Sequence, residues 1–178
     1  MLQWLKTRSN RKYTARQLYG SSVAVARAPV FYRDWGVADT LEGRFEMVAL
    51  HVALLLRRLT SEGAAGKALG QAVLEEMVAA LDDDMRELAV SDLKVSKKVQ
   101  AAAGAFFGRL RAYDEALKSA DAADLQKALA RNVPGSVATE RLAAYVRLTA
   151  TALESQSYAA LLAGTVSFPA PGVTDSAR

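Results

Sequence analysis

Cysteine is absent from this 178-residue sequence, and histidine occurs once, at His51. Without cysteine the chain forms neither disulfides nor thiolate sites, a composition that fits a reducing compartment. A single histidine excludes a histidine-rich metal site and leaves carboxylates as the main possible metal ligands. Acidic residues are missing before Asp34, so the first 33 residues carry a formal charge of +7, although the whole chain carries only +4. A basic segment of this kind can meet nucleic acid, an anionic membrane surface or an acidic partner.

Long apolar runs are lacking as well. The uncharged run between Glu46 and Arg57 is too short to cross a bilayer, which takes about 20 residues. No apolar stretch follows the first basic residues, so we expect no signal peptide. The sequence also lacks a P-loop, a dinucleotide-binding glycine motif, a nucleophile elbow and a histidine-rich metalloenzyme motif. These absences favour a binding protein over an enzyme.

What is present is a globular composition, with 51% hydrophobic and 24% charged residues. The segment 39–59 has apolar residues at the i, i+3, i+4, i+7 spacing of a helix, and further apolar residues leave little of its middle polar. We expect this segment to be the central buried helix. Asp39 is the expected N-cap, with Glu42 as its capping-box acid.

The remaining periodicity predicts further helices at about 13–28, 68–81, 97–118, 121–132 and 137–163, with residues 92–96 as a loop and Gly164 as a C-cap. The sequence therefore predicts an all-α fold: a single-domain bundle of about six helices around the apolar central helix. We expect a basic N-terminal arm at 1–12, a helical domain at 13–164 and an extended or disordered tail at 165–178.

Several segments allow two interpretations. The arm is either a frayed terminus or a membrane-surface anchor, whose membrane-facing residues would be Trp4, Lys6, Arg8, Arg11 and Lys12. The aromatic segment 29–38, expected to be a loop, either plugs one end of the bundle or contacts a partner. His51 is either a hydrogen-bonded core residue or a contact for a partner or cofactor. Asp82–Asp84 suggest a metal site, but adjacent helical residues point in different directions, which favours a solvated acidic surface.

Four phrases, in order, carry a family resemblance: FYRDWGVADTLEGRFEMVALHVALLLRRL (31–59), DDDMRELAVSDLKVSKKV (82–99), GAFFGRLRAYDEAL (104–117) and ALARNV (128–133). Together they resemble the ubiquinol–cytochrome c chaperone family, the assembly factors of the cytochrome bc complex. The ordered set, and the first phrase above all, is far more specific than any one phrase alone.

The resemblance implies a chaperone without enzymatic activity or a cofactor. Mitochondrial members of the family bind newly made cytochrome b with a small partner protein and hold it during early haem acquisition. This chain lacks their long amino-terminal extension, so we expect a bacterial member whose client is cytochrome b. A small co-chaperone and peripheral contact with an anionic membrane are the other expected partners, and nucleic acid is not one. The expected location is cytoplasmic, peripheral on the inner membrane, or on the matrix side in a eukaryote.

A helical bundle can receive an apolar client helix in a groove with a charged rim. The candidate partner-binding residues come from the aromatic segment, the central helix and the next long helix: Phe31, Tyr32, Trp35, Arg44, His51, Arg57, Arg58, Lys97, Lys98, Phe106, Arg109 and Tyr113. Each has a structural alternative. Phe106 and Tyr113 fit core positions, and Arg44 and Arg109 could pair with Asp84 or Asp114 inside the bundle.

Three other functions remain open at this point. The basic arm could bind nucleic acid, in which case binding would weaken steeply with salt. The apolar interior and Asp82–Asp84 could serve an enzyme acting on an isoprenoid or quinone-like substrate. Within the family, the protein could carry haem itself, with His51 as its only histidine ligand.

Overall fold

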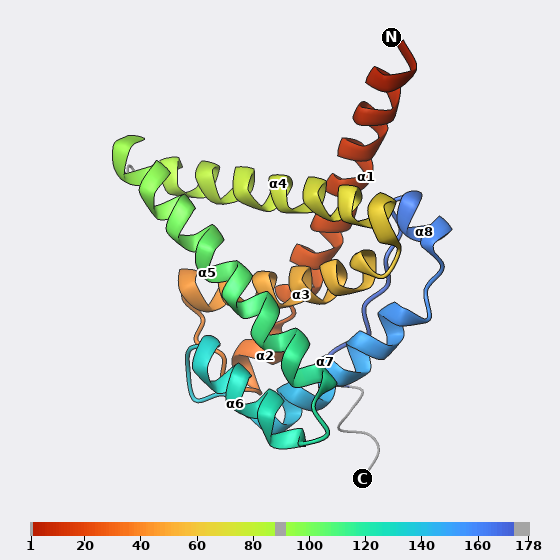
Figure 1. The fold of residues 1–178 in the computed structure, drawn as a ribbon. Helices are drawn as coiled ribbons and strands as arrows, with labels where there is room; N and C mark the ends of the chain where they lie inside the picture. Colours follow the sequence, from red (N-terminus) through yellow and green to blue (C-terminus); the bar gives the residue numbers. More distant parts are fainter. Residues whose placement is uncertain (1, 88–91, 173–178) are drawn as a thin grey trace.

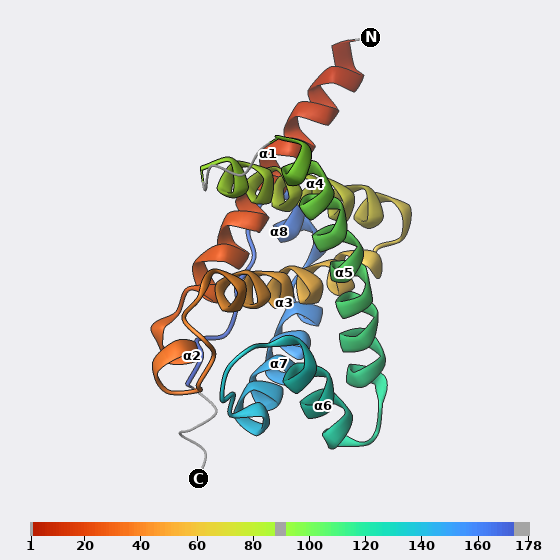
Figure 2. The same cartoon turned by 90° about the vertical axis from the view of Figure 1, so that its left-hand side faces the viewer.

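A computed structural model of the chain describes residues 2–87 and 92–172. These residues form eight α-helices and one isolated β-bridge (Figures 1 and 2): α1 (Leu2–Ala26), α2 (Pro29–Arg33), α3 (Leu41–Thr60), α4 (Gly63–Glu87), α5 (Asp92–Lys118), α6 (Ala122–Asn132), α7 (Thr139–Glu154) and α8 (Tyr158–Leu162). Six helices have at least 11 residues and two have five, which confirms the all-α bundle of about six helices.

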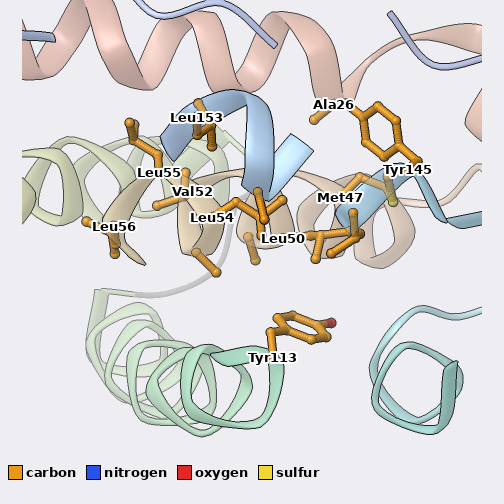
Figure 3. Close-up of a cluster of buried hydrophobic side chains, with 14 of the residues drawn as sticks. Ala26, Met47, Leu50, Val52, Leu54, Leu55, Leu56, Tyr113, Tyr145 and Leu153 are labelled. Carbon is orange, nitrogen blue, oxygen red and sulfur yellow. The ribbon is translucent and has the colours of Figure 1, made fainter. Parts of the chain in front are cut away.

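Helix α3 is the centre of the fold, as its apolar sequence predicts. It contacts α1, α4, α5 and α7. Figure 3 shows its aliphatic side chains meeting Ala26 of α1, Tyr113 of α5, and Tyr145 and Leu153 of α7. Burying one such aliphatic side chain contributes about 1.5–3 kcal/mol to stability. Because α3 buries several of them against its neighbours, it supplies much of the free energy that holds the other helices together.

The N-cap of α3 differs from the expected one. Thr40, with an extended backbone, accepts a hydrogen bond from the Gly43 amide through its side-chain oxygen (3.1 Å). Asp39 lies one residue too early to cap, and it pairs with Arg44 instead, Nε to Oδ1, at 2.7 Å. Glu42 lies in the first turn, where its charge suits the helix dipole.

Several other helix boundaries correct the sequence-based expectation. Helix α4 runs from Gly63 to Glu87, well beyond the expected 68–81 at both ends. Helix α1 begins at Leu2 and not near residue 13, because residues 2–12 contain no proline or glycine to stop it. Its first turns project away from the bundle (Figure 1). Helix α5 begins at Asp92, so 92–96 is helical and not a loop.

The last helix divides in two. Helix α7 ends at Glu154, and α8 starts after Ser157, whose hydroxyl accepts a hydrogen bond from the Ala160 amide (3.2 Å). Gly164 follows α8 with φ +82°, a left-handed conformation in keeping with its expected C-cap role.

The aromatic segment is not simply a loop. Residues 29–33 form the short helix α2, and the residues after it pair with the link between α6 and α7. The Ala38 amide donates to the Pro134 carbonyl (2.9 Å), and the Ala138 amide donates to the Trp35 carbonyl (2.8 Å). This pairing fixes the aromatic segment against α7.

Residues 165–172 carry no helix, as expected, but they are packed against the core. Val166 and Phe168 contact the hydrophobic core. Two hydrogen bonds join Gln156 to Ser167: Nε2 donates to the Ser167 carbonyl, and the Ser167 amide donates to Oε1, both at 2.8 Å. This part of the tail is therefore held in an extended course along the bundle. Residues 173–178 of the predicted tail lie outside the described residues.

Candidate functional site

An apolar groove runs between α4 and α5, and we call it the α4–α5 groove. It has a volume of about 530 Å³, and its lining residues are Gln71, Leu74, Glu75, Met77, Val78, Ala79, Asp82, Ala103, Phe106 and Phe107. Leu74, Met77 and Val78 recur at helical spacing, which places them on one face of α4. Phe107 is 54% exposed, although Phe106 beside it is buried. The groove thus presents an aromatic side chain to solvent, with the carboxylates Glu75 and Asp82 among its lining.

A second recess lies where α1, α3 and α4 meet, and we call it the α1–α3–α4 cleft. Its volume is about 470 Å³, and it is lined by Tyr19, Val23, Arg27, Leu41, Arg44, Phe45, Val48, Met77, Leu81 and Asp84. Met77 of α4 lines both recesses. The two recesses therefore lie on adjoining faces of α4, and their charges differ: the lining of the cleft contains two arginines and one aspartate, whereas that of the groove contains, among the described residues, two carboxylates and no cation.

His51 belongs to an aromatic cluster that contains buried Phe31, Trp35 and Tyr145 and half-buried Phe168. The ring centroids of Phe31 lie 5.3 Å from those of both Trp35 and Tyr145, with edge-to-face geometry. The His51 ring also meets Phe168 of the tail edge-on, at 5.6 Å. Such contacts are worth about 0.5–1.5 kcal/mol each beyond the buried area. These contacts support the first interpretation of the aromatic segment 29–38, in which it plugs one end of the bundle.

The hydrogen bonds of His51 settle its tautomer. Nδ1 lies 2.7 Å from the Met47 carbonyl, which can only accept, so Nδ1 carries the proton. Nε2 lies 2.9 Å from the Tyr145 hydroxyl and accepts from it. Burial lowers the pKa of His51 to about 4, so the ring is neutral at pH 7. Both nitrogens are occupied, which supports the core interpretation and leaves no lone pair free to ligate haem iron.

Glu46 and Arg109 form an ion pair between α3 and α5. Arg109 Nη2 lies 2.5 Å from Glu46 Oε1, and the Glu46 side chain is 2% exposed. Burial raises the pKa of Glu46 to about 7, although the Arg109 charge opposes the rise. Sequence reasoning missed this pair, because it considered only Asp84 and Asp114 as partners for Arg109. The available signal was an acidic residue, Glu46, within the apolar stripe of α3.

The other predicted arginines also have specific partners. Arg44 pairs with Asp39, and not with Asp84 or Asp114. Arg57 contacts both Asp114 (3.2 Å) and Glu154 (2.5 Å), which ties α3 to α5 and α7. Arg58 is buried and donates to Glu62 and to two carbonyls, one in the last turn of α7 and one in the turn that follows it. Arg57 and Arg58 therefore hold the C-terminal end of α3 in place.

Most of the predicted partner-binding residues that the structure describes are buried. Six of them are buried in the folded chain: Phe31, Trp35, His51, Arg58, Phe106 and Tyr113. Their burial supports the structural alternative for each, because a partner could reach most of them only by opening the core; Phe106 still lines the α4–α5 groove. Tyr32, Arg57 and Arg109 are half-buried, and Arg44 is exposed beside the α1–α3–α4 cleft.

The predicted membrane-facing residues are only partly described. Arg11 and Lys12 are exposed on α1, as a surface contact requires. The side chains of Trp4, Lys6, Arg8, Lys97 and Lys98 lie outside the part of the chain that the structure describes. Over residues 2–87 and 92–172, no helix is long and apolar enough to cross a bilayer. The same residues contain no group of three or more acidic or histidine side chains placed to hold a metal ion.

Comparison with known proteins agrees with the resemblance seen in the sequence. The family model for the ubiquinol–cytochrome c chaperone matches residues 33–168, about three quarters of the chain. The chain belongs to the ubiquinol–cytochrome c chaperone family. Both recesses and the buried His51 cluster are built largely from residues inside the matched range.

Two relatives of this family member extend the comparison. The crystal structure of the Cbp3 homolog from Brucella abortus superimposes with a TM-score of 0.82 and 35% sequence identity, over 95% of this chain and 97% of that one. A protein of Drosophila melanogaster, named ubiquinol-cytochrome c reductase complex assembly factor 1, is 28% identical over 158 residues. That match covers 84% of this chain but only 61% of the fly protein, so the chain spans about three-fifths of its relative's length.

Proposed function

We propose that this chain is an assembly chaperone of the ubiquinol–cytochrome c reductase complex, and that it binds newly made cytochrome b. The family membership and the name of the fly relative support the assembly role. The observation that carries the client-binding step is the α4–α5 groove, where Phe107 is 54% exposed in an apolar recess. An exposed apolar recess between two helices is a typical receptor for an apolar helix.

The charge of the groove suits the ends of membrane-spanning helices. Glu75 is exposed and accepts a hydrogen bond from Gln71, and Asp82 also lines the groove. Loops on the cytoplasmic side of membrane proteins are rich in lysine and arginine. A client helix lying in the groove would place such cations beside these carboxylates, which fixes its orientation.

The proposed mechanism is shielding. Newly made cytochrome b offers apolar helices that aggregate in water, and the groove covers part of one helix until the next assembly step. The exposed cations of α1, Arg11 and Lys12, would keep the chaperone beside an anionic membrane at the site of client synthesis. A small co-chaperone would cover client surface that a groove of this size leaves exposed.

The experiment replaces the native chain in cells by the Phe107→Glu variant and measures cytochrome b by immunoblot and haem spectrum. Binding an apolar helix there would bury the new carboxylate without a partner, which is costly. The variant should therefore lower cytochrome b, while unrelated membrane enzymes keep their levels. The matched control is Leu148→Glu, which adds the same charge at a 38%-exposed position on α7. Unchanged cytochrome b in the Phe107 variant, at equal protein abundance, would reject the groove as the client site.

A further inference from the structure

The α1–α3–α4 cleft has an uneven distribution of charge. Most of its lining is apolar, including Val23, Phe45, Val48 and Leu81, but Arg27 and Arg44 also line it. Both arginines are exposed, and only Asp84 among the lining residues carries a negative charge. The lining therefore carries one net positive charge against an apolar interior.

Both cations lie close enough to Tyr32 for their charges to act on its hydroxyl. Arg27 follows the last residue of α1, and Arg44 is in the first turn of α3. The Tyr32 hydroxyl donates a hydrogen bond to the Ala26 carbonyl (2.7 Å). Burial raises the pKa of this hydroxyl, and the positive charges of Arg44 and Arg27 oppose the rise. Burial raises the pKa of Tyr19, and there the charge of Asp84 adds to the rise while that of Arg27 opposes it.

In the described part of the chain, neither arginine forms a buried ion pair. Among the described residues, Arg27 has no acid within salt-bridge distance. Arg44 pairs only with Asp39, and both side chains are more than half exposed. Exposed pairs of this kind are weak and exchange readily. An anionic group at the mouth of the cleft could therefore recruit both guanidinium groups, which bind phosphate oxygens well.

From this geometry we infer that the α1–α3–α4 cleft binds an anionic membrane phospholipid, with one acyl chain in the apolar lining and the phosphate against Arg27 and Arg44. The volume of about 470 Å³ lies within the ~300–1,000 Å³ range of small-molecule sites. The site shares Met77 with the α4–α5 groove, but its arginines and its other lining residues are different, so failure of lipid binding would not by itself reject client binding.

The first test is titration calorimetry of the full chain with single-chain lipids below their micelle concentration. Lysophosphatidylglycerol should bind, and lysophosphatidylcholine of equal chain length should bind at least tenfold more weakly, because its choline cation opposes the arginines. Inorganic phosphate alone should give no measurable heat. Saturable binding of phosphate alone would assign the arginines to a free anion and overturn the lipid assignment.

Variants of the protein then distinguish the contribution of the lipid headgroup from that of its acyl chain. The double change Arg27→Ala and Arg44→Ala should weaken lysophosphatidylglycerol at least tenfold, whereas Asp84→Asn should tighten it. Val48→Trp should fill the cleft and block both lipids. The control removes two exposed arginines elsewhere, Arg111 and Arg131, and should change nothing; Arg111 leaves an exposed pair with Glu115, as Arg44 does with Asp39.

The arginine variant is expected to bind lysophosphatidylglycerol more weakly and the Asp84 variant more tightly. A protein that was merely destabilised would not bind more tightly, so the test does not depend on folding. Equal affinity for the two lipids, no binding at all, or binding unaffected by Val48→Trp would overturn the inference. An apolar helical peptide that binds the cleft and is not displaced by lysophosphatidylglycerol would assign it to a protein helix instead.

Discussion

The imidazole Nε2 of His51 lies 2.9 Å from the hydroxyl of Tyr145, although the two residues are 94 positions apart in the chain. This hydrogen bond joins the central helix α3 to α7 inside the core, where both side chains are fully buried. The hydroxyl donates and the imidazole accepts, since the other ring nitrogen donates to Met47. The Met47 carbonyl therefore fixes the tautomer of His51, and the bond to Tyr145 fixes the register between the two helices.

Removing the donor should be costly. In Tyr145→Phe the Nε2 atom of His51 stays buried and loses its partner, which typically costs about 1–3 kcal/mol. Urea unfolding followed by circular dichroism measures the change in the free energy of unfolding. Tyr13→Phe is the matched control, because Tyr13 is 66% exposed and should change little. Equal stability of the two variants would contradict the proposed role of the bond.

Acid should destabilise the fold through His51. Burial lowers its pKa to about 4 in the folded chain, against 6.5 for the unfolded one. The unfolded state therefore takes up a proton first as the pH falls from 6.5 to 4, and the stability held by the neutral ring above pH 6.5 is lost over that range. The difference corresponds to about 3 kcal/mol. The measurement is the unfolding free energy of wild type minus that of His51→Gln between pH 7 and 4.5; a pH-independent difference would show that His51 is not held neutral.

Glu46 should make the fold less stable as the pH rises, the opposite of the effect of His51. Burial raises its pKa from 4.5 to about 7, so the folded state keeps the proton that the unfolded state releases. Its contribution is fully present below pH 4.5 and is lost as the pH rises through 7, by as much as about 3 kcal/mol. Comparison of wild type with Glu46→Gln by thermal unfolding from pH 5 to 8 isolates this effect. Wild type should lose stability relative to the variant as the pH rises, and a relative gain would mean that Arg109 keeps the carboxylate ionised.

Local patterns in the sequence predicted local structure well. The helical spacing of apolar residues identified α3 as the buried centre, and Gly164 was expected to end the last helix, where it follows α8 with a positive φ. These features depend on residues within a few positions of each other, so the chemistry of one segment determines them. The core position of His51 was one of two interpretations of the sequence, and its place within an apolar helix was the reason for it.

Long-range pairs could not be predicted in this way. Periodicity shows which face of a helix is buried but not which helix covers it, so the partners Arg109 for Glu46 and Tyr145 for His51 depend on the topology. The tail illustrates the same limit: Phe168 lies in a proline-containing segment without periodicity, yet it packs on His51. The two recesses also became visible only once α1, α4 and α5 were placed around α3.

The most direct test of client binding is photo-crosslinking in living cells. A benzophenone amino acid at position 107 would lie in the α4–α5 groove, and the same amino acid at position 148 would lie on α7 as the control. Irradiation followed by mass spectrometry of the adducts should recover cytochrome b from position 107 and little or none from position 148. Equal yields of cytochrome b at both positions, or adducts at position 107 that never contain it, would contradict the account.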